Sequence, residues 1–173
     1  MADILWTPWR LDFILGAKKP GCVLCDKAHQ GNVPDAENLV LYRGQHCFII
    51  LNLYPYSIGH LMVLPYLHTN DFVSLAPDTL AELTDLTRRG VALLKQTHHP
   101  DGLNLGMNLG KVAGAGIDDH LHMHIVPRWN GDNNFMPVLG QTRMMPETLE
   151  QTYTKLKAPL KDYFEPPSGG WQD

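Results

Sequence analysis

The chain has 173 residues, of which 44% are hydrophobic and 18% are charged, a composition typical of one globular domain with a sizeable core. Its 14 basic and 18 acidic side chains give a formal charge of −4, and a mildly acidic chain without a basic run is not expected to bind nucleic acid. No stretch approaches the roughly 18 consecutive apolar residues of a membrane span, and 3 cysteines are an odd number that makes a poor disulfide framework.

The N-terminal segment is expected to pack against other parts of the protein. Residues 1–4 lack the basic and then apolar layout of a signal peptide, so we expect a cytoplasmic protein. Trp6 and Trp9 are large aromatic residues that should be covered by the same subunit or by a dimer partner. We expect a single domain over residues 1–173, with an N-terminal arm (1–21), a core (22–157) and a loose C-terminal tail (158–173).

Cys22 and Cys25 follow the arm and are separated by two residues. Two thiolates at this spacing suit a zinc ion. Two buried free thiols would give the same pattern, so the pair alone leaves both interpretations open.

Residues 39–65 have the composition of an antiparallel meander. Gly44 suits the first turn, and the segment 52–59 is a loop rich in turn-forming residues. The apolar residues Ile50, Leu51 and Leu53 could line a slot for a ligand, although a place in the core is the more common role. The strands are expected over residues 39–42, 47–51 and 60–65.

The second half of the chain begins with one long helix. Pro77 suits a first helical position, and leucines then recur roughly at helical spacing to about residue 97. A strand is expected over 103–107, and a last helix over about 146–156. Strands, one long helix and further strands together predict an α+β domain.

Three histidines, at 120, 122 and 124, alternate with apolar residues. In a strand their side chains share one face, with neighbours roughly 7 Å apart, whereas a helix would scatter them around its axis. An imidazole near neutral pH can be a nucleophile, an acid, a base or a metal ligand. A structural role, and a zinc site formed by all three, are the alternatives.

The pattern over residues 120–126 resembles the signature of the histidine triad (HIT) superfamily of nucleotidyl hydrolases and transferases. Residues 52–63 and 104–110 resemble further segments of that family, and the similarity covers roughly residues 5–157. Residues 127–135, with the N-terminal residues 5–10, look most like the bacterial diadenosine tetraphosphate phosphorylase branch, near the Fhit-type hydrolases. The resemblance implies an α+β fold with a half-barrel antiparallel sheet and a C-terminal helix, a homodimer, and cleavage of a phosphoanhydride through a nucleotidyl-histidine intermediate.

The resemblance also implies roles for single residues. The catalytic set is His120, His122 and His124, with His122 as the nucleophile and His124 as the donor to the leaving group. Backbone N–H groups of the glycine-rich loop would hold phosphate. At Gly116 relatives are expected to carry a hydroxyl or an amide, so hydrolysis and phosphorolysis both stay open. The nucleotide-binding residues implied are Asn52, His60, Asn108, Gly114, Ala115, Gly116 and Ile117.

A structural zinc site is implied in the same way. Relatives such as galactose-1-phosphate uridylyltransferase combine a cysteine pair with two histidines, which match here Cys22, Cys25, His68 and His120. No organic cofactor is expected.

The resulting hypothesis is an enzyme that cleaves adenine dinucleoside polyphosphates. A nucleoside phosphoramidase of the same superfamily and a nucleotide-binding module with incidental turnover are the alternatives. The segment 127–135, with its tryptophan, argues against the phosphoramidase.

Overall fold

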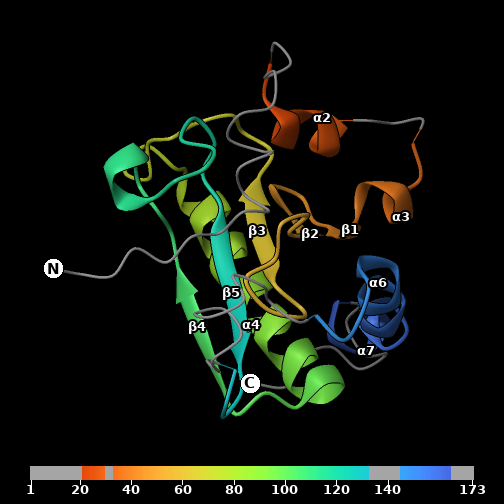
Figure 1. Ribbon diagram of the computed structural model, residues 1–173. Coiled ribbons are helices and arrows are strands. Elements are labelled where there is room, and N and C mark those ends of the chain that lie inside the picture. The colour runs from red at the N-terminus through yellow and green to blue at the C-terminus, as the bar shows by residue number, and fades with distance from the viewer. Residues whose placement is uncertain (1–20, 30–32, 133–144, 165–173) are drawn as a thin grey trace, which may run out of the picture.

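The computed structural model describes residues 21–29, 33–132 and 145–164, which Figure 1 colours along the chain. Apart from Gly21, the expected N-terminal arm lies outside the described residues. The elements are α2 (Val23–His29), α3 (Asp35–Asn38), β1 (Val40–Arg43), β2 (Cys47–Leu51), β3 (Leu61–Pro65), α4 (Pro77–His98), β4 (Gly102–Gly106), the 3-10 helix η1 (Lys111–Ala113), β5 (Met123–Arg128), α6 (Leu149–Lys157) and α7 (Leu160–Phe164).

The strands form one open antiparallel sheet in the order β1-β2-β3-β5-β4. The first three strands are the expected meander, and β5 then lies between β3 and β4. The β3–β5 register places Met62 opposite His124. This sheet with its helices confirms the α+β fold and puts the histidine segment near the centre of the sheet.

Apolar side chains fill two cores, one on each face of the sheet. Because side chains alternate along a strand, Ile49 and Leu51 of β2 pack with leucines of α4, whereas Phe48 and Ile50 pack with α2. Figure 1 shows α4 running behind the sheet and α2 above the ends of β2 and β3. The strand β2 is therefore buried on both faces, and the face that carries Met62 also receives α2.

The long helix α4 has nearly the bounds that the leucine spacing predicts. Pro77 occupies its first turn, and its apolar stripe is buried. Gly90 lets the helix approach the sheet closely, since an added Cβ would lie 2.8 Å from Cδ1 of Ile125. The helix thereby seals one face of the sheet directly behind β5.

The C-terminal part of the chain differs from its prediction as a loose tail from residue 158. The short helix α7 buries Leu160 and Phe164 in the core shared with α4. The preceding helix α6 is fixed to β1, because Tyr153 and Lys157 donate hydrogen bonds to the carbonyl oxygens of Val40 and Leu41. The ordered domain thus extends at least to residue 164, and residues 165–173 lie outside the described residues.

The histidine segment is a strand only in its second half. β5 begins at Met123, so His120 and His122 precede it. The backbone N–H of Leu121 donates instead to the carbonyl oxygen of Thr69, at 2.8 Å, in the loop after β3. The expectation of one regular strand over the three histidines was therefore wrong.

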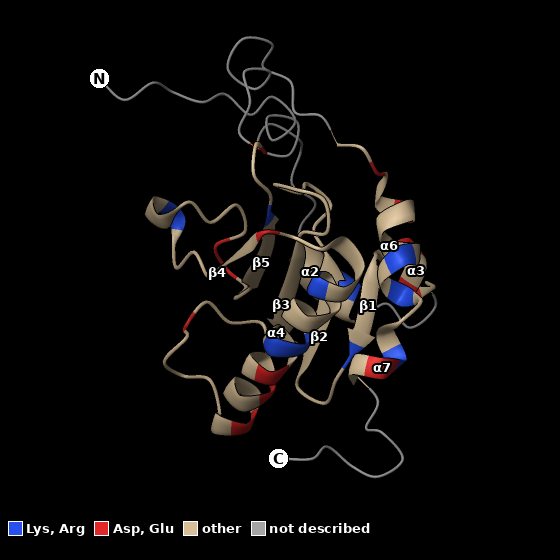
Figure 2. Ribbon diagram, turned by 90° about the horizontal axis from the view of Figure 1, so that it is seen from below, with Lys and Arg blue, Asp and Glu red and all other residues tan. Residues whose placement is uncertain are grey.

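Among the described helices, none is long and apolar enough to cross a membrane. Lysines and arginines are distributed over several separate elements rather than along one of them, as Figure 2 shows for the described chain.

Candidate active site

The backbone carbonyl of His120 holds the ring of His122. The Nδ1 atom of His122 lies 2.8 Å from this oxygen. Because a carbonyl can only accept, Nδ1 carries the proton and the lone pair of the neutral ring is on Nε2. Burial lowers the pKa of His122, although the hydrogen bond to His120 acts in the opposite direction. At neutral pH His122 is thus an imidazole with a nucleophilic lone pair on Nε2.

A second hydrogen-bond chain sets the tautomer of His124. The backbone N–H of Tyr56 donates to Nδ1 of His60 at 3.1 Å, so a neutral His60 carries its proton on Nε2. That Nε2 lies 2.9 Å from Nδ1 of His124. The neutral His124 ring therefore accepts at Nδ1 and keeps an N–H at Nε2, ready to donate.

His60 does not line the cavity that is bordered by His122 and His124. It is fully buried, with 0% exposure, between the 52–59 loop and His124. Its ring contacts His124, and its expected contact with nucleotide stays a prediction. We conclude that His60 is placed to position His124.

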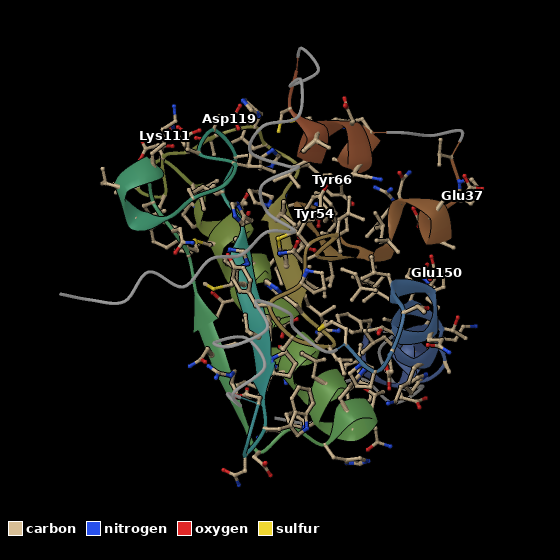
Figure 3. The ribbon with its side chains drawn as sticks, in the orientation of Figure 1. Glu37, Tyr54, Tyr66, Lys111, Asp119 and Glu150 are labelled. Atoms are coloured by element: carbon tan, nitrogen blue, oxygen red, sulfur yellow. The ribbon has the colours of Figure 1, made fainter. Side chains whose placement is uncertain are left out.

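The rings of His122 and His124 border one open cavity. They meet nearly at right angles, with centroids 4.7 Å apart. Figure 3 shows Tyr54 in the region between β5 and α2. The other lining residues come from α2, β3 and two loops: Leu24, Asn52, Tyr54, Tyr56, Met62, Asn108, Gly116 and Ile117.

The apolar residues considered for a slot do not line the cavity, and the more common role in the core is confirmed for two of them. Ile50 and Leu51 belong to the two cores, and Leu53 is 54% exposed outside the cavity. The cavity instead takes its apolar walls from Leu24 and Met62, which sequence reasoning missed. Met62 could not be found from sequence, because only the β3–β5 register brings it beside His124. Leu24 could not be found either, because the C-x-x-C spacing does not indicate that a residue between the cysteines lines a ligand site.

The glycine-rich loop is only partly the phosphate nest that was expected. The N–H groups of Gly114 and Ala115 donate within the loop, to the carbonyl oxygens of Lys111 and Gly110. Neither residue lines the cavity, whereas the following Gly116 and Ile117 do. Of the four loop residues predicted to bind nucleotide, Gly116 and Ile117 are therefore the two that line the cavity.

Asn52 and Asn108 both line the cavity, and their contacts with a nucleotide stay predictions. Oδ1 of Asn52 accepts the backbone N–H of Tyr54 at 2.9 Å, which fixes the orientation of its side chain. Asn108 donates to the carbonyl oxygen of Gly114 at 3.4 Å. Both asparagines line the same cavity as the two histidines, so polar groups from two loops border the site.

A second group of side chains, which are possible metal ligands, lies at the start of the histidine segment. The ligand atoms of its four members all lie within 4.8 Å of one another, and the group could hold a metal ion. The sulfur of Cys22 is 3.4 Å from Nδ1 of His120, and the sulfur of Cys25 is 3.3 Å from Nδ1 of His68. This metal cluster consists of the four predicted residues, Cys22, Cys25, His68 and His120.

The donor set of the metal cluster fits tetrahedral coordination. Zn–S and Zn–N bonds of about 2.3 and 2.0 Å place tetrahedral ligand atoms about 3.6 Å apart, close to the spacing found. Nε2 of His120 lies 2.9 Å from the carbonyl oxygen of Pro65, so its Nδ1 keeps the lone pair for a metal. Burial and the neighbouring Cys22 raise the pKa of Cys25 to about 11, whereas a cation between the sulfurs would favour thiolates.

Residues 33–131 match the HIT domain family model, so the chain belongs to the histidine triad family. It is 38% identical, over 154 residues, to a protein of Mycobacterium tuberculosis named AP-4-A phosphorylase. The match covers 86% of this chain and 79% of that relative.

Solved structures of the family share the fold. A Zn-bound histidine triad family protein from Mycobacterium smegmatis superposes with a TM-score of 0.65 at 29% identity, over 82% of this chain and 94% of its own. A hypothetical histidine triad nucleotide-binding protein from Sulfolobus tokodaii gives a TM-score of 0.63 at 28% identity, over 87% and 100% of the two chains.

Proposed function

We propose that this protein cleaves dinucleoside polyphosphates such as diadenosine tetraphosphate through a covalent nucleotidyl intermediate on His122. The observation that carries the proposal is the tautomer of His122, whose Nδ1–H is bound to the His120 carbonyl while Nε2 is available. Its likeness to the mycobacterial AP-4-A phosphorylase supports an adenine dinucleotide as the substrate.

In the first step, Nε2 of His122 attacks the α-phosphorus of the substrate. An N–P bond forms and the bond to the bridging oxygen breaks. The leaving oxygen accepts a hydrogen bond from Nε2–H of His124, whose Nδ1 accepts from His60, and the product leaves as a phosphate anion. Diadenosine tetraphosphate would leave AMP on His122 and release ATP.

In the second step, water or inorganic phosphate attacks the same phosphorus and breaks the N–P bond. Nε2 of His122 regains its lone pair, the proton of an attacking water passes to solvent, and phosphate attacks through an anionic oxygen, so the starting tautomers are restored. Water releases AMP, whereas phosphate releases ADP. Asn52 and Asn108 are proposed to hold the ribose and the phosphates, and Gly116 and Ile117 to offer backbone N–H groups to the phosphate.

The metal cluster is proposed to bind zinc in a structural role. Two thiolates and two imidazoles form a closed four-ligand set, with no position left for a substrate. Bound zinc would cross-link α2, the loop after β3 and the histidine segment. The Zn-bound M. smegmatis relative supports this assignment.

A single domain and a homodimer are also proposed. The edge strand β4 and the loop after it expose Leu105, Leu109 and Val112, at 53%, 51% and 105%. An unpaired edge with exposed apolar side chains is suited to pairing with a second copy.

The test is to incubate the purified protein with diadenosine tetraphosphate, with and without inorganic phosphate, and to identify the nucleotides. AMP with ATP in the absence of phosphate identifies a hydrolase, and ADP with ATP only in its presence identifies a phosphorylase. We expect His122→Ala to lower turnover by at least about a thousand-fold. His99→Asn is the matched control, because His99 is exposed and has a left-handed backbone (φ 46°) that asparagine tolerates.

Full activity of folded His122→Ala would overturn the covalent mechanism. Absence of products, together with cleavage of an AMP-lysine-type amide, would overturn the substrate class and favour the phosphoramidase.

A further inference from the structure

We propose that metal binding at the metal cluster and nucleotide binding in the adjacent cavity are energetically coupled, each strengthening the other. The proposal rests on the nucleotide-binding function above and goes beyond a zinc site that only stabilises the fold. Two connections between the sites carry it, one through the side chain of Leu24 and one through the backbone of His120.

The first connection is Leu24, which lies between the two thiols in sequence. Its side chain is 4% exposed and forms part of the cavity wall with Met62 and Ile117. Cys22 and Cys25, on either side of it, supply the two sulfurs of the metal cluster. Any change that moves these sulfurs therefore moves a wall of the cavity.

The helix that carries Leu24 is too short to fix its own position. α2 has 7 residues, and isolated helices of fewer than about 12 are marginal in water. Its C-terminal end is held by Arg43, which donates to the carbonyl oxygens of Lys27 and Ala28 at 3.1 and 2.7 Å. At its N-terminal end, the two thiols are the groups that reach across to His68 and His120. A metal would anchor the end of α2 that faces the cavity.

The second connection is His120, which belongs to both sites. Its ring faces the two sulfurs, each 3.4 Å from Nδ1, while its carbonyl oxygen accepts Nδ1–H of His122. Because this segment precedes β5, the sheet ladder does not hold it directly. Fixing the ring of His120 thus also fixes the carbonyl that orients His122.

The coupling must be reciprocal by thermodynamic linkage. If zinc raises the affinity for a nucleotide by some factor, the nucleotide raises the affinity for zinc by the same factor, and typical factors are about 5 to 150. If zinc only stabilised the folded state, the affinity of the folded protein for a nucleotide would not depend on zinc, and its affinity for zinc would not depend on the nucleotide.

The experiment uses the full chain and AMP, which binds without being cleaved. AMP affinity is measured by calorimetry with one equivalent of Zn²⁺ and after chelation, and Zn²⁺ affinity by competition with a chelating dye, with and without saturating AMP. We expect each ligand to tighten the other at least about five-fold, by the same factor.

Leu24→Ala removes the side chain that connects the two sites and keeps all four metal ligands. We expect this variant to keep its Zn²⁺ affinity in the absence of AMP. The logarithm of its coupling factor should fall to one half of the wild-type value or less. Leu67→Ala is the matched control: Leu67 precedes the ligand His68 but is 56% exposed and does not line the cavity, so the factor should be unchanged.

If the chelated protein unfolds, folding alone would make each ligand tighten the other. The decision then rests on Leu24→Ala against Leu67→Ala, because only a connection through the Leu24 side chain makes the first variant lose coupling while the second keeps it. Equal Zn²⁺ affinities with and without AMP would overturn the coupling while leaving the proposed activity intact. Failure to bind Zn²⁺ would also overturn it. Failure to bind AMP in either state would instead contradict the proposed function.

Discussion

At the scale of single residues, the outer side of the metal cluster carries a carboxylate that the sequence did not single out. Oδ2 of Asp119 lies 4.0 Å from Nε2 of His68, whose Nδ1 faces Cys25. Figure 3 shows Asp119 on the loop that leads into β5. A carboxylate behind a ligating histidine orients the ring and increases its basicity. Asp119 is thus placed to tune metal affinity.

We expect Asp119→Asn to weaken Zn²⁺ binding by about ten-fold, the low end of the usual range for such partners, because both side chains are about half exposed. Competition with a chelating dye measures the change. Asp118→Asn is the control, since it removes the same charge from a side chain that pairs with Lys111 at 3.6 Å. Equal losses in the two variants would show a general charge effect and contradict the specific role of Asp119.

At the scale of elements, one side chain of α4 organises the turn between β1 and β2. The carboxylate of Glu82 accepts the backbone N–H groups of Gln45, His46 and Cys47. Glycine suits position 44, because a Cβ would lie 2.9 Å from the carbonyl oxygen of Cys47 and would also displace the carboxylate of Glu82. The helix therefore supplies hydrogen-bond acceptors to a turn that the strand ladder leaves unsatisfied.

Glu82→Ala should lower the free energy of unfolding by about 2–3 kcal/mol, because three N–H groups lose a charged acceptor and solvent replaces it only in part. Denaturant unfolding followed by circular dichroism measures the loss. Asp78→Ala, an exposed acid in the first turn of the same helix, should cost less than about 1 kcal/mol. Similar losses for both variants would mean that helix charge, rather than the turn, dominates.

At the scale of the whole molecule, His98 should make stability depend on pH. It is buried where the end of α4 meets the residues before α6, with Nε2 3.5 Å from Oε2 of Glu147. Burial lowers its pKa, as does Lys155, while Glu147 acts in the opposite direction. A lowered folded-state pKa means that the unfolded chain binds the proton more readily, so protonation favours unfolding.

The contribution of neutral His98 to stability is fully present above its pKa in the unfolded chain, about 6.5, and is lost as the pH falls below that value. The free energy of unfolding then declines by up to about 1.4 kcal/mol per pH unit. We expect His98→Gln to flatten the decline of unfolding free energy between about pH 6.5 and 5. His99→Asn should flatten it less, because the charge of His99 is only a minor cause of the lowered pKa of His98. His120 and His122 also have lowered pKa values, so part of the slope should remain. An unchanged slope in His98→Gln would contradict the prediction.

Much of the architecture follows from local patterns. The strand over Cys47–Leu51 has its predicted bounds, and the long helix exceeds its prediction by one residue, because proline position and apolar period are encoded in neighbouring residues. The short helices α2, α3 and α7 escaped prediction. Helices of 4 to 7 residues are stabilised by what they pack against rather than by their own sequence.

The candidate site divides in the same way. The alternating histidines and the cysteine spacing identify the chemical groups from sequence alone. Only the sheet order β1-β2-β3-β5-β4 decides that His60 holds His124, that Leu24 and Met62 wall the cavity, and that His120 links the metal cluster to His122. Apart from the local contact of His122 with the carbonyl of His120, these contacts join residues that are tens of positions apart. No local periodicity encodes the register of two distant strands.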